Sequence, residues 1–280
     1  MKNILIPTDF SENAWNALLY GISFFKKTHC AFYIVHVNSV NTNTSGETAM
    51  FLSPDILEES ILVESKEKLN KLMSKIEHLP LNVKHEFKPI ALYGFLTDHI
   101  KTQVKEKKID LIIMGTKGST GLKSVSIGSN TGDVITKVPC TVLAVPEHAV
   151  YSGIKEIGFP SDFQLTYDHK ILETLKDILL LKKSALRLLY VSLNNEKLSP
   201  IQENNKRILM EHYKDIECSF HVVTGKKIDE SIQCFTESRN LDMLVMVAKN
   251  LNFLERILFR PTVEKISYHT KVPFLVIHES

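Results

Sequence analysis

An internal repeat constrains the fold of this chain more than any other feature of its sequence. Three pairs of segments correspond: KNILIPTDFS (2–11) with KEIGFPSDFQ (155–164), IDLIIMG (109–115) with LDMLVMV (241–247), and TVLAVPE (141–147) with PFLVIHE (273–279). The first pair is offset by 153 residues and the other two by 132. We therefore predict two related domains in tandem, 1–148 and 153–280, with a linker near 147–153.

Strands alternate with helices within the first unit. The strand-like segments are NILIPT, AFYIVHV, VKHEFKPI, DLIIMG and TVLAV. Amphipathic helical patterns separate them, with Ser11 as one N-cap and Ser53 followed by Pro54 as the start of another helix. Parallel neighbours need crossover helices on both faces, so the pattern predicts an α/β fold made of two tandem, doubly wound, parallel five-stranded sheets.

Composition excludes several classes of protein. The 280 residues are 44% hydrophobic, and 34 basic against 32 acidic side chains give a net charge of +2. This balance carries no electrostatic footprint for nucleic acid, and apolar runs such as TVLAV are far too short to span a membrane. The N-terminus lacks the pattern of a signal peptide and the four cysteines form no C-x-x-C pair, so we expect a cytoplasmic protein without a zinc site.

Glycines gather after the fourth predicted strand, in IIMGTKGSTGLKSVSIGSN (112–130). Gly115 ends a buried strand, and Gly118 can adopt the positive φ that turns successive amides into one concavity. Gly128 and Ser129 then open a helix whose free N–H groups suit an anion. In a doubly wound sheet these residues share the crevice beyond the carboxyl ends of the strands with 7–9 and 36–38, so we predict a phosphate cradle there.

The segments ILIPTDFSENAWNAL and YIVHV, and above all Gly115-x2-Gly118-x9-Gly128-Ser129, resemble the nucleotide-binding branch of the universal stress proteins. The resemblance implies a Rossmann-like fold of the adenine nucleotide alpha hydrolase type and a bound adenine nucleotide, ATP or AMP/ADP, with Mg²⁺ left open. It implies that Asp9 holds the sugar or base, the backbone at Val37 the adenine edge, and the glycine motif the phosphates. The predicted cofactor-binding residues are Pro7, Thr8, Asp9, His36, Val37, Gly94, Met114, Gly115, Thr116, Lys117, Gly118, Gly128, Ser129, Asn130 and Thr131.

Simpler interpretations stand beside these roles. Asp9 precedes a helix and is repeated as Asp162, so a helix-entry cap would explain both copies. His36 lies in an apolar strand, as a hydrogen-bonded core histidine does. Trp15 is typical of packing, although its position near the crevice predicts that its fluorescence reports binding.

The glycine motif is absent from the second unit. Gly115, Gly118, Gly128 and Ser129 correspond there to Val247, Asn250, Arg260 and Pro261. A branched side chain and a residue without an N–H do not suit a phosphate cradle. We therefore predict one nucleotide for each chain.

No catalytic motif accompanies the predicted cradle. The sequence has no G-x-x-x-x-G-K-[ST] loop, and its loops offer few candidate metal ligands or nucleophiles. We predict a nucleotide-binding regulatory protein that responds to stress or energy status, with a slow ATPase or a nucleotide-independent protein scaffold as alternatives. The apolar strands 142–146 and 274–278 are predicted to pair within the chain as an internal pseudo-dimer; a homodimer of whole chains stays open.

Overall fold

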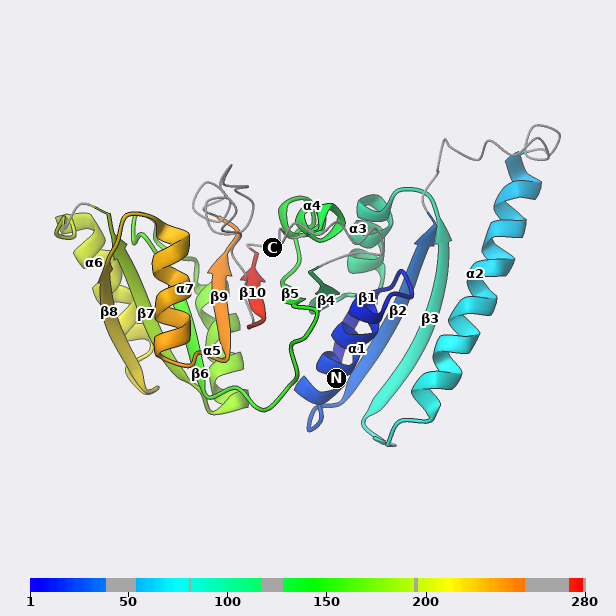
Figure 1. The fold of residues 1–280 in the computed structure, drawn as a ribbon, viewed down its shortest axis with the longest axis horizontal. Coiled ribbons are helices and arrows are strands. Elements are labelled where there is room, and N and C mark those ends of the chain that lie inside the picture. The colour runs from blue at the N-terminus through cyan, green and yellow to red at the C-terminus, as the bar shows by residue number, and fades with distance from the viewer. Residues whose placement is uncertain (39–53, 81, 117–127, 194–195, 250–271, 279–280) are drawn as a thin grey trace.

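The computed structural model describes residues 1–38, 54–80, 82–116, 128–193, 196–249 and 272–278 (Figure 1). The first unit comprises β1 (Lys2–Pro7), α1 (Glu12–Phe24), β2 (Cys30–Asn38), α2 (Pro54–Glu77), β3 (His85–Tyr93), α3 (Leu96–Glu106), β4 (Leu111–Gly115), α4 (Ser129–Lys137) and β5 (Val142–Val145). The second comprises β6 (Glu156–Pro160), α5 (His169–Lys182), β7 (Ala185–Ser192), α6 (Pro200–His212), β8 (Cys218–Thr224), α7 (Ile228–Ser238), β9 (Met243–Val247) and β10 (Phe274–Ile277). The predicted alternation of strands and helices is confirmed in both units.

The strands form one ten-stranded sheet in the order β3-β2-β1-β4-β5-β10-β9-β6-β7-β8. Each half is parallel, as predicted, and the halves meet where β5 and β10 pair antiparallel with Leu143 opposite Leu275. The predicted internal pseudo-dimer is therefore confirmed. The two five-stranded sheets are halves of a continuous sheet, because this pairing satisfies backbone groups that two free edges would leave open.

Helices cover both faces of the sheet (Figure 1). On one face of the first unit, α1 and α2 bury side chains such as Leu18 and Leu69 against alternate strand residues. On the other face α3 and α4 bury Ile100, Val134 and Ile135. Burial on both faces explains why β4 and β5 read as continuous apolar runs.

The repeat extends to the hydrogen bonds that anchor the first strand of each unit. Asp110 Oδ2 accepts a hydrogen bond from the backbone N–H of Asn3 at 2.7 Å. Its repeat counterpart Asp242 accepts one at 2.9 Å from the N–H of Glu156, the residue equivalent to Asn3, and a second from the N–H of Lys155. Both aspartates precede the strand next to the one they anchor, so the repeat preserves a tertiary contact as well as a pattern of strands.

The units also meet beside α1 and α5. The Lys182 ammonium of α5 lies 3.5 Å from the centre of the Phe24 ring and donates to the Phe24 carbonyl at the end of α1. Tyr151 of the linker packs edge-on against Tyr20 at 5.4 Å between ring centres. Burial lowers the pKa of Lys182 to about 8. Polar and aromatic contacts thus supplement the strand pairing between the two halves.

Candidate functional site

The strand order of the first unit creates a switch point between β1 and β4. From β1 the chain crosses to α1 on one face, and from β4 it continues to α4 on the other. Loops that diverge in this way leave a crevice at the carboxyl edge of the sheet, where ligands of open α/β sheets bind. The predicted residues at the ends of β1, β2 and β4 therefore lie along one edge.

Residues 8–11 form a compact turn between β1 and α1. Asp9 Oδ1 accepts hydrogen bonds from the N–H of Ser11 at 3.0 Å and from its hydroxyl at 2.6 Å. The Ser11 hydroxyl oxygen in turn accepts from the N–H of Ala14, which confirms Ser11 as the N-cap. Phe10 adopts a positive φ of 64°, a conformation that bulky residues rarely occupy. Asp9 thus has a structural role in helix entry.

The second unit repeats this turn. Asp162 Oδ1 accepts from the N–H of Gln164 at 3.1 Å, and Phe163 has a φ of 54°. Since the second unit lacks the glycine motif, the shared turn belongs to the fold of both units. Any contribution of Asp9 to a ligand is additional to this role.

His36 is half-buried at the end of β2. Its Nδ1 lies 2.7 Å from the carbonyl oxygen of Thr8, and its ring centre is 4.5 Å from that of Phe10. The contact fits an Nδ1–H donor and matches the interpretation of a hydrogen-bonded histidine. It also ties the end of β2 to the loop after β1, which places the neighbouring Val37 beside the predicted crevice.

The connection between β4 and α4 brings the outer parts of the glycine motif together. The N–H of Gly128 donates to the carbonyl of Thr116 at 2.6 Å, and the buried Thr131 hydroxyl donates to the carbonyl of Gly115 at 2.7 Å. Ser129 is the first residue of α4, and Gly128 is its N-cap, without a side-chain hydrogen bond to the helix. The prediction that Gly128 and Ser129 open a helix is therefore confirmed, with Gly128 rather than Ser129 as the N-cap.

Gly128 has no side chain with which to cap the first N–H groups of α4. Ser129 and Asn130 are exposed there, whereas the Thr131 hydroxyl proton is directed into the fold. A Cβ at Gly115 would lie 2.7 Å from Nδ2 of Asn13, so this glycine also allows α1 to pack closely on β4. The predicted residues Lys117 and Gly118, and the loop lysine Lys123, lie outside the described residues.

The remaining candidates frame the same edge. Pro7 and Met114 are buried near the ends of β1 and β4. The backbone N–H of Thr116 donates to the carbonyl oxygen of Val145 at 3.0 Å. Gly94, after β3, has a φ of 137°, and a Cβ there would meet His99 Nε2 at 2.6 Å. A turn requirement and a close approach therefore explain this glycine without a ligand.

A cleft of about 320 Å³ opens between α1 and α2 next to this site. Thr8 and Phe10 line it together with Trp15, and the Lys75 ammonium lies 4.0 Å from the centre of the Trp15 ring. The expected position of Trp15 near the crevice fits this geometry. Sequence reasoning missed the α2 lysines Lys68, Lys71 and Lys75, whose helical spacing was the available signal.

The corresponding loop of the second unit is closed by α6. Phe163 is completely buried, and Asn205 Nδ2 of α6 donates to its carbonyl at 2.9 Å. Gln202 Nε2 donates to the carbonyl of Asp162 at 2.7 Å. In the second unit, the carbonyl groups after β6 therefore accept hydrogen bonds from α6. In the first unit, the equivalent turn after β1 lines a cleft instead.

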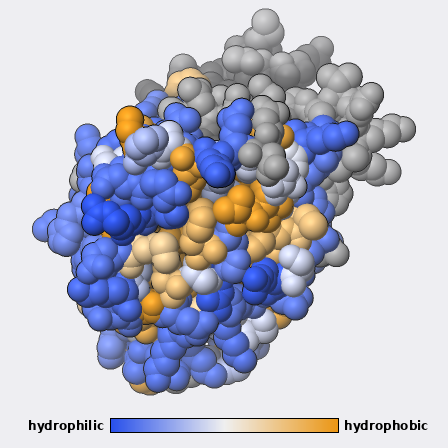
Figure 2. Space-filling view, turned by 90° about the vertical axis from the view of Figure 1, so that its left-hand side faces the viewer, coloured by the Kyte–Doolittle hydropathy of each residue, from blue (hydrophilic) through white to orange (hydrophobic). Residues whose placement is uncertain are grey.

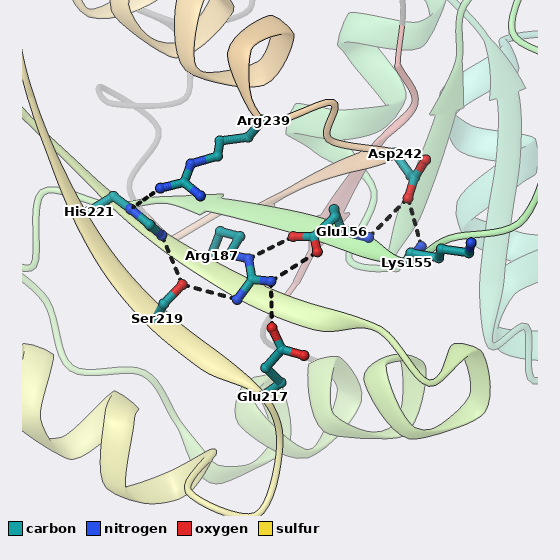
Figure 3. Close-up of polar contacts among 8 residues, drawn as sticks. All are labelled: Lys155, Glu156, Arg187, Glu217, Ser219, His221, Arg239 and Asp242. Carbon is teal, nitrogen blue, oxygen red and sulfur yellow. Dashed lines mark hydrogen bonds and ion pairs between the residues drawn. The ribbon is translucent and has the colours of Figure 1, made fainter.

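A separate polar cluster lies on β6, β7 and β8 (Figure 3). Arg187 forms two hydrogen bonds with Glu156, at 2.6 and 2.9 Å, and one with Glu217 at 2.6 Å. Its remaining contact is with the hydroxyl of Ser219, which also lies 2.8 Å from His221 Nε2. Hydrogen bonding to the Glu156 carboxylate raises the pKa of Arg187 above its ordinary value. These groups satisfy one another and join three strands, as structural ion pairs do.

Across the described ranges, no group of three or more His, Cys, Asp and Glu side chains is arranged to hold a metal ion. None of the helices that the structure describes is both long and apolar enough to cross a membrane.

The architecture defines a class of protein: tandem α/β units, each a doubly wound five-stranded sheet, joined edge to edge into one sheet. The sequence matches the model of the universal stress protein family at residues 1–146 and again at 154–278. The chain therefore belongs to the universal stress protein family, in its tandem two-domain form.

Individual relatives agree with this assignment. Universal stress protein MJ0531 of Methanocaldococcus jannaschii is 32% identical over 146 residues, which cover 51% of this chain and 81% of the relative. Universal stress protein Slr1230 of Synechocystis sp. is 22% identical over 292 residues, with 98% and 99% of the two chains covered. The structure of a universal stress protein from Archaeoglobus fulgidus matches with a TM-score of 0.68 at 19% identity, covering 99% of this chain and 96% of that one. This last likeness shows the fold.

Proposed function

We propose that the first unit binds one adenine nucleotide, ATP or AMP/ADP, and that the protein is a regulatory member of its family that responds to stress or energy status. The observation that supports the proposal is the β1/β4 switch point, where the ends of both strands lie at one edge of the sheet and the N-cap of α4 is a glycine, which has no capping side chain. Uncapped N–H groups and the positive end of a helix favour a phosphate group.

Two groups of residues at the carboxyl edge of the sheet would contact different parts of the nucleotide. Gly115, Gly118 and the start of α4 would hold the phosphates through backbone N–H groups. Asp9 and the backbone at Val37 would contact the sugar and base, consistent with their places after β1 and near the end of β2. The Ser11 hydroxyl is held between the Asp9 carboxylate and the N–H of Ala14 in the helix-entry turn, so we assign the loop to binding rather than to catalysis.

The proposal is tested by mass spectrometry of the small molecules that freshly purified, denatured protein releases. Near one equivalent of adenine nucleotide supports it. Calorimetry of the emptied protein with ATP, ADP and AMP then ranks the nucleotides, and Gly118→Val should abolish binding because a branched side chain would obstruct the cradle. Absence of released nucleotide together with absence of calorimetric binding would refute the proposal.

A further inference from the structure

The two outer edges of the ten-stranded sheet differ in how they are protected. β3 ends the sheet on one side and β8 on the other. α2 runs alongside β3 in Figure 1 and contacts it more extensively than any helix contacts β8. The sequence of β3 also contains Glu86, Lys88 and Pro89, the residue types that discourage pairing at an edge.

The sequence of β8 lacks the charged and proline residues found in β3. Its sequence, CSFHVVT, contains no proline and no Asp, Glu, Lys or Arg. Registers within the repeat make Phe87 of β3 equivalent to Cys218, so Pro89 of β3 corresponds to Phe220 of β8. The edge strand β3 therefore lacks a backbone N–H at Pro89, whereas β8 has one at the equivalent residue Phe220.

Backbone hydrogen bonds show which groups of β8 face outward. Leu186 N–H donates to the carbonyl of Glu217, and Gly225 N–H donates to that of Ser192. Odd-numbered residues of β8 thus point their backbone groups at β7, and the even-numbered residues point theirs away from it. The outward set is Cys218, Phe220, Val222 and Thr224. Within the described part of the chain, no strand pairs with this side of β8.

The side chains at this end are also suited to burial. Figure 2 looks onto the end and shows an apolar area enclosed by polar surface. The Val222 side chain is 55% exposed on β8, and Ile208 is exposed on the neighbouring helix α6. An accessible edge with apolar flanks is a template for strand addition.

We propose that β8 is a homodimer interface, at which β8 of a second copy of this chain adds antiparallel and extends the sheet across a twofold axis. The molecule already contains this mode of association, since the apolar, uncharged strands β5 and β10 pair antiparallel at its pseudo-twofold axis. Pairing the whole of 218–224 with itself places His221 opposite its own copy and matches outward-facing residues with outward-facing residues.

Charge supports a second copy as the occupant. Glu217 precedes β8 and, although it contacts Arg187, its side chain is 73% exposed; Lys226 and Lys227 follow β8. In the antiparallel register centred on His221, Glu217 of one copy lies opposite Gly225 and next to Lys226 of the other. The two ends of the interface therefore each bring opposite charges together, which favours this arrangement over a parallel one.

The test measures molar mass by light scattering over a concentration series from about 1 to 100 µM, which covers the weaker end of specific interfaces. We expect wild-type protein to approach twice the 31.9 kDa chain mass. Val222→Pro removes an outward N–H without touching the β7 ladder and should give monomers. Ala91→Pro makes the equivalent change in β3 and should remain dimeric, with circular dichroism confirming that both variants fold.

Cross-linking provides an independent readout of the register. Residues directly opposite in a non-hydrogen-bonded antiparallel pair have Cα atoms about 4.5 Å apart, which is within disulfide range. His221→Cys in a Cys218→Ser, Cys234→Ser background should therefore form a covalent dimer on oxidation. Monomers at every wild-type concentration, or a dimer that Val222→Pro leaves unchanged, would overturn the proposal. Val222→Lys, which places like charges across the interface, decides the matter if the proline variant fails to fold.

Discussion

Replacing Asp9 with alanine distinguishes a helix-entry role from a nucleotide-binding role. The change removes the carboxylate oxygen that accepts from the N–H and the hydroxyl of Ser11. Losing hydrogen bonds to a charged group at a helix entry should lower the free energy of unfolding by about 1–3 kcal/mol. On this basis alone, Asp9→Ala would destabilise the protein whether or not it binds a nucleotide.

The second unit supplies a matched control. Asp162 forms the same turn through the N–H of Gln164, but the glycine motif does not follow it. Asp162→Ala should lose about 0.5–1.5 kcal/mol of stability, the net contribution of one intramolecular hydrogen bond, and should leave nucleotide affinity unchanged. Urea unfolding measures the stability of both variants, and calorimetry measures their affinity for ATP at a temperature where both are folded.

The comparison of the two variants gives the result. If Asp9 contacts the nucleotide, Asp9→Ala weakens binding by about tenfold or more, equivalent to 1.4 kcal/mol or more, beyond any effect of Asp162→Ala. Lower stability with wild-type affinity in both variants would refute the nucleotide contact and assign Asp9 wholly to helix entry.

Three further predictions concern the junction and the number of sites. Leu143→Ala and Leu275→Ala should each cost about 2–5 kcal/mol of stability, because both side chains are buried and opposite each other across β5 and β10; a double-mutant cycle in urea should show coupling of about 0.5–3 kcal/mol, and additive losses would contradict their contact. Burial lowers the pKa of Lys182 from 10.5 to about 8, so between these pH values the unfolded chain binds a proton that the folded chain has lost. The free energy of unfolding of the wild type, minus that of Lys182→Met, should therefore rise with pH over this range. A flat difference would mean that the Phe24 contacts offset burial. Calorimetry should give one nucleotide per chain, all of it lost in Gly118→Val; residual binding would place a second site in the second unit.

Much of the fold could be predicted because it depends on local patterns that the repeat presents twice. Apolar strand segments, the Ser11 cap and the start of α2 at Pro54 are set by a few neighbouring residues, and the structure has them as predicted. The pairing of β5 with β10 was also predictable, since two apolar edge strands in related units need partners.

Other features depend on contacts between distant residues and leave no local signal. The closure of the second unit depends on Asn205 and Gln202 of α6, which reach a loop about 40 residues earlier in the chain. Polar residues on a predicted helix are ordinarily assigned to solvent, so sequence reasoning could not assign them to that loop.

The asymmetry of the two units gives the second one a role that needs no ligand. A single unit would expose the outer edge of β5, whose four residues are all buried in this chain. β10 pairs with that edge, and the second unit needs only to fold correctly in order to present β10 there. Selection for the partner strand would preserve β6, the Asp162 turn and the Asp242 anchor. It would not preserve a phosphate cradle, which agrees with Val247 in place of Gly115 and with a loop closed by α6. The covalent link would then replace a dimer of identical units by a pair in which the first unit carries the proposed nucleotide site and the second completes the sheet.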